Sequence, residues 1–248
     1  MDLGLRGRAA LVTGGGSGIG AAIALELAAE GCDVAIADRD AAGAESVAGQ
    51  VSARGVRGLA RAADVSDFAL AQSVVRDVAE AFGRLDILVC CAGITDDAPS
   101  WRMDERQWDR VMSVNLKGCF NYSRAAGAHM KDRKGGRIVH IASINGLRGK
   151  FGQANYAASK GGLVALAKTL ARELGRYDVT VNVIAPGMVR TPLSAGLPAE
   201  VVQRAVEETV SGQLAEPADC AAAVAFLCSD RARHVTGQVL KVDSGQYM

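Results

Sequence analysis

Tyr156 and Lys160 are the residues of this chain whose types and spacing point most directly to chemistry. They are four positions apart, and residues at this spacing share one face of a helix. A lysine ammonium beside a phenol favours the ionised form of the phenol. A phenol that can release and recover a proton is a general acid and base. The pair therefore predicts proton transfer, provided that the chain also binds a reactant beside it.

A glycine-rich turn near the N-terminus predicts where such a reactant is bound. The segment 13–20 follows an apolar strand pattern and opens a helical one. Glycines at this place let the backbone approach a pyrophosphate at a helix N-terminus. The residues expected to contact it are Gly14, Ser17, Gly18, Ile19 and Gly20.

Asp38 indicates which dinucleotide is bound. It ends the second strand pattern about 20 residues after the glycines, where a carboxylate can accept hydrogen bonds from both ribose hydroxyls. A carboxylate there repels a 2′-phosphate, so NAD(H) is favoured over NADP(H). Arg39 keeps NADP(H) open as the alternative, because a guanidinium can bind a 2′-phosphate; it can equally be a solvated loop charge.

Strand and helix patterns alternate along the whole chain, which predicts a parallel sheet with helices on both faces. We expect one domain over 1–248, a Rossmann-type, doubly wound sheet of about seven strands. The expected strands are 9–13, 33–37, 58–62, 86–90, 137–142, 179–184 and 238–242. The expected helices are 18–30, 41–54, 67–83, 104–130, 154–175 and 217–228. The alternation breaks at 188–212, which we expect to be a mobile lid over the site.

Ligands of such sheets lie outside the carboxyl ends of the strands. This places Asp64 and Val65, after the third strand, and Ala92 and Gly93, after the fourth, at the edge of the cofactor site. For Asp64, capping of the next helix is an alternative role that is compatible with the first.

Composition excludes several other classes of function. The formal charge is +1 with acids and bases interspersed, which gives no footprint for nucleic acid or an anionic membrane. No apolar run approaches a membrane span, and the N-terminus lacks a signal-peptide core, so a cytoplasmic protein is expected. The six cysteines and three histidines have no zinc-site spacing, so no metal site is expected, and His140 is interpreted as a histidine of a buried strand.

Together these motifs resemble the short-chain dehydrogenase/reductase family over essentially the whole chain. They are Thr-Gly-x-x-x-Gly-x-Gly at 13–20, Asp64-Val65, Asn115, Ser143, Tyr-x-x-x-Lys at Tyr156 and Lys160, and Pro186-Gly187 leading through Val189 to Thr191. The resemblance implies a nicotinamide-dependent oxidoreductase, usually a homotetramer. The chain departs from the family pattern at Cys90-Cys91, where many relatives have two asparagines whose amide groups would tie the end of the fourth strand to its neighbours. We expect a tolerated packing change, which also places cofactor affinity in question.

The resemblance also implies a role for each site residue. Tyr156 exchanges a proton with the carbonyl or alcohol, and Lys160 lowers the pKa of the phenol and binds the nicotinamide ribose. Ser143 hydrogen-bonds the substrate oxygen, and Asn115 holds a water in a proton relay toward Lys160. Further cofactor contacts are expected from Pro186, Gly187, Val189 and Thr191. Taken alone, Ser143 reads as a turn residue and Asn115 as a solvent-facing helix residue.

The middle of the chain is most similar to the branch of 3-oxoacyl-(acyl-carrier-protein) and acetoacetyl-CoA reductases, notably over 93–97 and 145–156. This favours a small-molecule or acyl-thioester substrate. Asp38 keeps the alternative of an NAD-dependent dehydrogenase of secondary alcohols, hydroxyacyl-CoA or polyols. A basic cluster at Lys131, Arg133 and Lys134 suits either a ligand contact, with an acidic carrier protein or a CoA phosphate, or, more simply, a helix C-terminus. A nicotinamide-binding sensor without turnover is disfavoured, because the tyrosine and lysine are both present.

Overall fold

The computed structural model describes residues 2–248, so Met1 lies outside the described residues. Seven strands form one parallel sheet in the order β3-β2-β1-β4-β5-β6-β7. Their bounds are β1 Ala9–Thr13, β2 Asp33–Asp38, β3 Gly58–Ala62, β4 Ile87–Cys90, β5 Gly136–Ile141, β6 Val179–Pro186 and β7 Val239–Val242. The order of the strands reverses between β1 and β4, which is where sheets of this kind bind ligands.

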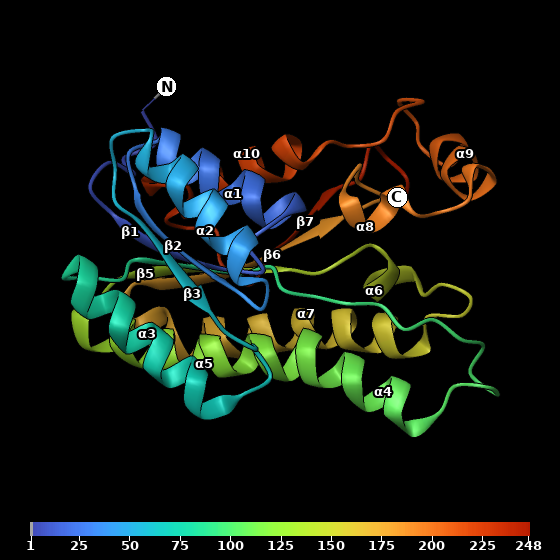
Figure 1. Cartoon of the computed structure of the whole chain (residues 1–248), viewed down its shortest axis with the longest axis horizontal. Helices are drawn as coiled ribbons and strands as arrows, with labels where there is room; N and C mark the ends of the chain where they lie inside the picture. Colours follow the sequence, from blue (N-terminus) through green and yellow to red (C-terminus); the bar gives the residue numbers. More distant parts are fainter. Residues whose placement is uncertain (1) are drawn as a thin grey trace.

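Helices cover both faces of the sheet (Figure 1). One layer contains α1 Gly18–Ala29, α2 Ala41–Ser52 and α10 Pro217–Cys228. The other contains α3 Phe68–Phe82, α4 Glu105–Val111, α5 Gly118–Arg133 and α7 Ala154–Leu174. The short helices α6 Asn145–Arg148, α8 Pro192–Ala195 and α9 Ala199–Glu207 lie beyond the sheet at one end, and 3-10 turns occupy Gly175–Tyr177 and Asp230–Ala232. The predicted doubly wound fold is therefore confirmed.

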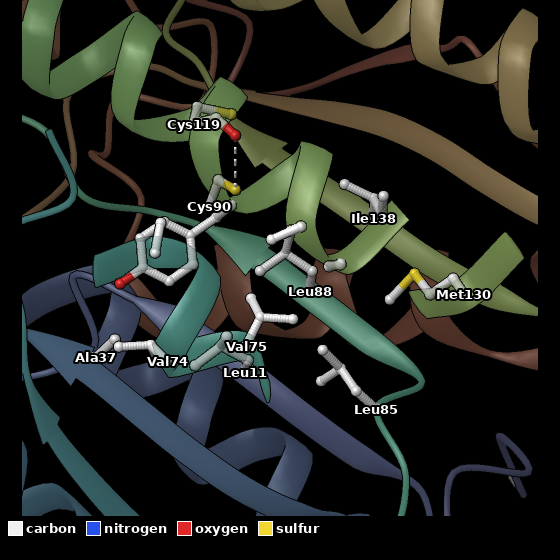
Figure 2. Close-up of a cluster of buried hydrophobic side chains, with 14 of the residues drawn as sticks. Leu11, Ala37, Val74, Val75, Leu85, Leu88, Cys90, Cys119, Met130 and Ile138 are labelled. Carbon is white, nitrogen blue, oxygen red and sulfur yellow. Dashed lines mark hydrogen bonds between the residues drawn. The ribbon is translucent and has the colours of Figure 1, made fainter. Parts of the chain in front are cut away.

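The core is two apolar layers separated by the sheet, as expected when strands carry helices on both faces. Figure 2 shows the layer beneath α3 and α5, where Leu11, Leu88 and Ile138 from three neighbouring strands meet Val74 and Val75. All five side chains are buried. Close packing of this layer fixes the positions of the strand ends. The site is built on these strand ends.

The predicted elements agree with the structure to within one or two residues, with one exception. The helix predicted at 104–130 is interrupted by a π-helical segment, Met112–Lys117, and it continues to Arg133. Wide π turns are common at functional sites, and this one holds Asn115. A periodicity of 3.6 residues does not reveal a single wider turn.

The basic cluster Lys131, Arg133 and Lys134 is an exposed helix end. It closes α5 and directly precedes β5, and Lys134 takes a left-handed conformation with φ 54°. The cluster therefore lies at the amino end of the sheet, away from the carboxyl ends that form the site. Its position favours the simpler of the two interpretations, a helix C-terminus that carries suitable charges.

The predicted lid at 188–212 contains α8, α9 and their connections. Its far end is tied to the C-terminal segment, because the amide of Val210 donates to the carbonyl of Ser244 at 2.9 Å. Glu208, directly after α9, pairs with Arg148 at 3.0 Å. The lid is thus joined to the loop after β5; its mobility stays a prediction. None of the helices in residues 2–248 combines the length and apolar content that crossing a membrane requires.

Candidate active site

Two adjoining cavities open at the carboxyl ends of the strands. The first, of about 390 Å³, runs along the glycine turn and the ends of β2 to β4. The second, of about 240 Å³, lies between the end of β5, the start of α7 and the lid. Ile19, Cys91, Gly93 and Thr191 line both cavities, so the two form one continuous cleft. We refer to them as the dinucleotide cavity and the substrate cavity.

The glycine turn is shaped for close backbone approach. Gly14 has φ +66°, and a Cβ there would lie 2.5 Å from Cα of Ala92. A Cβ on Gly20 would lie 2.0 Å from the carbonyl oxygen of Gly14. Ser17, the N-cap of α1, makes no side-chain capping bond, so the first N–H groups of α1 remain available to an anion. These features fit a pyrophosphate at the helix N-terminus.

Asp38 ends β2 and lines the dinucleotide cavity beside the glycine turn. Its Oδ2 accepts a hydrogen bond from the amide of Gly16 at 2.9 Å, and its Oδ1 accepts one from the amide of Asp40 at 3.0 Å. Each bond uses one lone-pair direction, so both oxygens can accept further bonds. The carboxylate is thus held in place and can still receive two ribose hydroxyls.

Arg39 is exposed beside the same cavity, and its charge contributes to a lowered pKa of Asp64. The main causes of that lowering are the bonds that Asp64 accepts from the amide and hydroxyl of Ser66, at 2.9 and 2.7 Å. Asp64 therefore shapes a turn at the cavity. The alternative role proposed for it, capping of α3, is wrong: Asp67 is the N-cap and accepts from the amide of Leu70.

Tyr156 lines the substrate cavity from the first turn of α7. Burial raises the pKa of its phenol to about 12, and the neighbouring Ser143 hydroxyl opposes this rise. The negative charge of Asp97 adds to it. The net direction is opposite to the lowering expected from Lys160. In the protein alone, desolvation outweighs the hydrogen bond with Ser143, so the phenol is protonated and can donate a proton at neutral pH.

Lys160 lies one turn further along α7 and is buried. Its Nζ is 5.7 Å from the centroid of the Tyr156 ring and donates to the carbonyl oxygen of Ile141 at 2.8 Å. Burial lowers its pKa. The four-residue spacing thus places the ammonium beside the phenol as predicted, and the end of β5 holds it there.

Ser143 lies two residues after β5 and is linked to a chain of polar side chains. Its Oγ accepts from the amide of Asn145 at 3.2 Å, and the Asn145 amide side chain donates to Gln153 at 3.1 Å. Gln153 in turn donates to Asp97 at 2.8 Å. This chain fixes the wall of the substrate cavity around Ser143 and Tyr156.

Asn115 is buried, so the alternative interpretation of it as a solvent-facing helix residue is wrong. Its Oδ1 accepts from the amide of Ile94 at 2.8 Å, and its Nδ2 donates to the carbonyl of Ile94 and to the Ser159 hydroxyl. Ser159 donates to the carbonyl of Tyr156 at 2.8 Å. The side chain therefore connects the segment after β4 to the helix that carries Tyr156, and it has little capacity left for a water.

All predicted site residues except Asn115 line one or both cavities. The dinucleotide cavity receives Gly14, Ser17, Gly18, Ile19, Gly20, Asp38, Arg39, Asp64, Val65, Ala92, Gly93 and Thr191. The substrate cavity receives Ser143, Tyr156, Lys160, Pro186, Gly187 and Val189. The residues that sequence reasoning missed also share the substrate cavity: Thr95, Asp97, Asn145, Arg148, Lys150, Gln153, Met188, Ser194, Leu197 and Gln246. The polar run 145–153 directly before Tyr156 was the available signal for four of them; none existed for Gln246.

Cys91, at the departure from the family pattern, lines both cavities, and its amide donates to the hydroxyl of Thr13 at 3.3 Å. Burial raises the pKa of its thiol to about 12. The same amide also donates to the carbonyl of Thr13 at 3.1 Å, so the end of β4 is held to β1 without an asparagine side chain. This supports the interpretation of the cysteine as a tolerated packing change.

A second polar cluster lies beneath the cleft, where the ligand atoms of Cys90, Cys119 and His140 are all within 4.8 Å of one another. The Ser123 hydroxyl lies among them, 2.9 Å from His140 Nε2 and 3.8 and 3.9 Å from the two sulfurs. Burial raises the pKa of Cys119 well above its ordinary value. We interpret the cluster as a hydrogen-bonded part of the core; the expectation that the chain has no metal site stays a prediction.

His140 predicts a pH dependence of stability. Burial lowers its pKa to about 4, helped by the charge of Lys160 and opposed by a backbone bond with Leu163, whereas an unfolded histidine has a pKa of about 6.5. Between these values the unfolded chain binds more protons, so the free energy of unfolding falls as pH falls. We expect His140 to account for a loss of about 3 kcal/mol between pH 7 and pH 4.

Urea unfolding from pH 4 to 8, at constant protein concentration, measures this loss. His140→Gln removes the titrating group and keeps a partner for Ser123, so its unfolding free energy should vary less with pH. The same substitution at the exposed His234 is the control. Equal pH dependence in wild type and His140→Gln would contradict the assignment.

The fold and the cleft together define a class of protein. A dinucleotide cavity at the switch point of a parallel sheet opens into a second cavity that holds a phenol, an ammonium and a serine hydroxyl. These are the components of a nicotinamide-dependent oxidoreductase that acts on CH–OH groups.

Comparison with known proteins agrees with this class. A family model described as enoyl-(acyl carrier protein) reductase matches residues 14–246. The chain is 40% identical over 245 residues to a 3-oxoacyl-(acyl-carrier-protein) reductase FabG of Staphylococcus aureus, covering 97% of this chain and 98% of the relative. It is 42% identical to a (3R)-3-hydroxyacyl-CoA dehydrogenase of Canis lupus familiaris, covering 98% of each chain. A solved structure of a putative short-chain alcohol dehydrogenase from Sinorhizobium meliloti superposes with a TM-score of 0.94 at 40% identity, covering 97% of this chain and 96% of that one. The chain belongs to the short-chain dehydrogenase/reductase family.

Proposed function

We propose that the protein interconverts 3-oxoacyl and 3-hydroxyacyl thioesters with NAD(H). The observation that carries the proposal is the wall of the substrate cavity, where Ser143, Tyr156 and Lys160 face the same space that adjoins the dinucleotide cavity. The full-length relatives at 40% and 42% identity are named for 3-oxoacyl and 3-hydroxyacyl thioester chemistry. A ketone beside a thioester is therefore the substrate that we assign to this cavity.

The residues then act as follows. Ser143 and Tyr156 bind the substrate oxygen, and Tyr156 donates its proton to that oxygen during reduction or removes one from the alcohol during oxidation. Lys160 favours the phenolate left by proton donation and binds the cofactor ribose. Asn115 holds the helix of Tyr156 in place, so the relay water assigned to it would bind its main chain. The cofactor, when bound, supplies or accepts the hydride.

NAD(H) is favoured over NADP(H) by the charges at the end of β2. The carboxylates of Asp38 and Asp64 both line the dinucleotide cavity, and Arg39 lies close enough to Asp64 to lower its pKa. A 2′-phosphate would meet two carboxylates and one guanidinium. The same feature supports the second candidate, an NAD-dependent dehydrogenase of another secondary alcohol or a polyol.

We also propose that the protein is a homotetramer, as the family resemblance implies. An apolar hollow of about 530 Å³ lies between α5 and α7, lined by Leu116, Phe120 and Leu166 among others, and Phe120 is 42% exposed. Exposed apolar surface of this kind marks contact faces. Sedimentation velocity measures the assembly, and a monomer would contradict the proposal. The cytoplasmic location stays a prediction.

The first experiment follows absorbance of the reduced nicotinamide with acetoacetyl-CoA, in parallel with NADH and NADPH. We expect rapid oxidation of NADH and slower oxidation of NADPH. Oxidation of neither cofactor would reject the thioester assignment and favour the secondary-alcohol candidate, which a panel of alcohols with NAD⁺ then tests.

A further inference from the structure

Two exposed aromatic side chains lie on loops next to residues that line the substrate cavity, and we call this place the mouth of the cavity. Trp101 is 74% exposed and Phe151 is 79% exposed. Their rings pack edge to face, with centroids 6.1 Å apart and an interplanar angle of 66°. Most apolar side chains of this size are buried, so a packed pair left in solvent needs a reason other than folding.

The pair is held in a fixed place relative to the cavity. The loops that carry it are joined where the amide of Ala98 donates to the carbonyl of Gly152 at 2.9 Å. Lys150 and Gln153, on either side of Phe151 and Gly152, both line the substrate cavity. Both loops extend past the carboxyl edge of the sheet, at the end where α8 and α9 lie (Figure 1). The rings are therefore neighbours of a part of the cavity wall, although they do not line the cavity themselves.

Each ring has a cation as its neighbour in the chain. Arg102 follows Trp101 in the chain, Lys150 precedes Phe151, and both are exposed. Within residues 2–248, neither has a carboxylate within 4.0 Å, whereas the nearby Arg110 and Arg148 are paired with Asp96 and Glu208. The mouth therefore combines two exposed aromatic rings with two exposed positive charges that form no ion pair.

We propose that this mouth binds the nucleotide of coenzyme A, so that the physiological thioester is a CoA ester. Adenine stacks on an aromatic face irrespective of hydrogen bonding, and lysine and arginine bind the phosphates. An acidic carrier protein fits less well, because its wider face would also meet the exposed carboxylates of Asp97, Asp104 and Glu105. The inference rests on the proposed thioester function and names its carrier.

The test compares two thioesters of the same acyl group. Acetoacetyl-CoA carries the nucleotide, and the acetoacetyl thioester of N-acetylcysteamine does not. In Trp101→Ala/Phe151→Ala we expect the KM for the CoA ester to rise about tenfold or more, with kcat and the KM for the short thioester unchanged. In Arg102→Gln/Lys150→Gln the KM for the CoA ester should rise and depend less on salt. Phe68→Ala, an exposed aromatic outside both cavities, is the matched control.

Several outcomes overturn the inference. An equal rise in KM for both thioesters means that the rings only shape the cavity, and an unchanged KM for the CoA ester means that they do not touch the nucleotide. A rise in the KM of the aromatic double variant for acetoacetyl carrier protein alone, and not for the CoA ester, assigns the mouth to the carrier protein. A smaller assembly of the aromatic double variant in sedimentation assigns it to a second copy of this chain.

Calorimetric titration of CoA into protein saturated with NAD⁺ separates this inference from the proposed function. CoA binding that is weakened in Trp101→Ala/Phe151→Ala, without thioester reduction in the wild type, supports the nucleotide site and rejects the reaction. Thioester reduction by the wild type, with CoA binding unchanged in the variant, supports the reaction and rejects the nucleotide site.

Discussion

Tyr156→Phe is expected to lower kcat by about a thousandfold or more while leaving the dissociation constant of NADH nearly unchanged. The substitution removes only the phenolic hydroxyl, which faces the substrate cavity. Neither Ser143 nor Lys160 replaces it as the donor: a serine hydroxyl is a much weaker acid than a phenol, and the Lys160 ammonium is held at the carbonyl of Ile141, one helical turn beyond the phenol. Steady-state kinetics with acetoacetyl-CoA and fluorescence titration of NADH measure the two quantities.

The pH profile adds a second check on Tyr156. A pKa of about 12 in the protein alone keeps the phenol protonated at neutral pH, so reduction should be flat with pH until the phenol ionises. Oxidation needs the ionised phenol, so the rate of oxidation should rise with pH until the phenol is fully ionised. Tyr177→Phe, outside both cavities, is the matched control. Turnover retained in Tyr156→Phe would remove the assigned role.

The relation between Tyr156 and Lys160 shows what a local pattern can predict. Their spacing placed the two side chains together, because helix geometry depends only on neighbouring residues. The direction of the phenol's pKa was not predictable in the same way. The pKa depends on burial of the phenol near the lid and the end of β5, and on the charge of Asp97. These groups come from distant parts of the chain.

The same distinction holds for the other site residues. The glycine turn and Asp38 were found because each lies at a strand end that the sequence pattern predicts. Gln246 was missed because its place in the cavity is set by long-range contacts: its side chain accepts from the amide of Met188 and donates to Glu208. The π turn that buries Asn115 was missed because one extra residue in a turn leaves no periodic signature.

Asp38→Ala is expected to raise the ratio of kcat/KM for NADPH to that for NADH by about a hundredfold. A carboxylate about 5 Å from a phosphate charge opposes it by about 3 kcal/mol at an effective dielectric constant near 20. Removing the carboxylate leaves Arg39 free to meet a 2′-phosphate, and it also removes the acceptor of the ribose hydroxyls, so NADH should bind more weakly. Initial rates with both cofactors at fixed acetoacetyl-CoA give the ratio.

The structure supplies a control for this prediction, because Asp38 also supports the glycine turn through the amide of Gly16. Asp38→Asn keeps an oxygen for that bond, but it removes the charge and also the second oxygen, which accepts from the amide of Asp40. If charge decides the choice of cofactor, Asp38→Asn and Asp38→Ala should shift the ratio alike, whereas a shift in the alanine variant alone would mean that the turn had been disturbed. The double variant Asp38→Ala/Arg39→Ala should lose the increase in kcat/KM for NADPH, because no cation then remains to bind the 2′-phosphate. A wild-type enzyme that already prefers NADPH would show that Arg39 outweighs both carboxylates and that the assignment of NAD(H) is wrong.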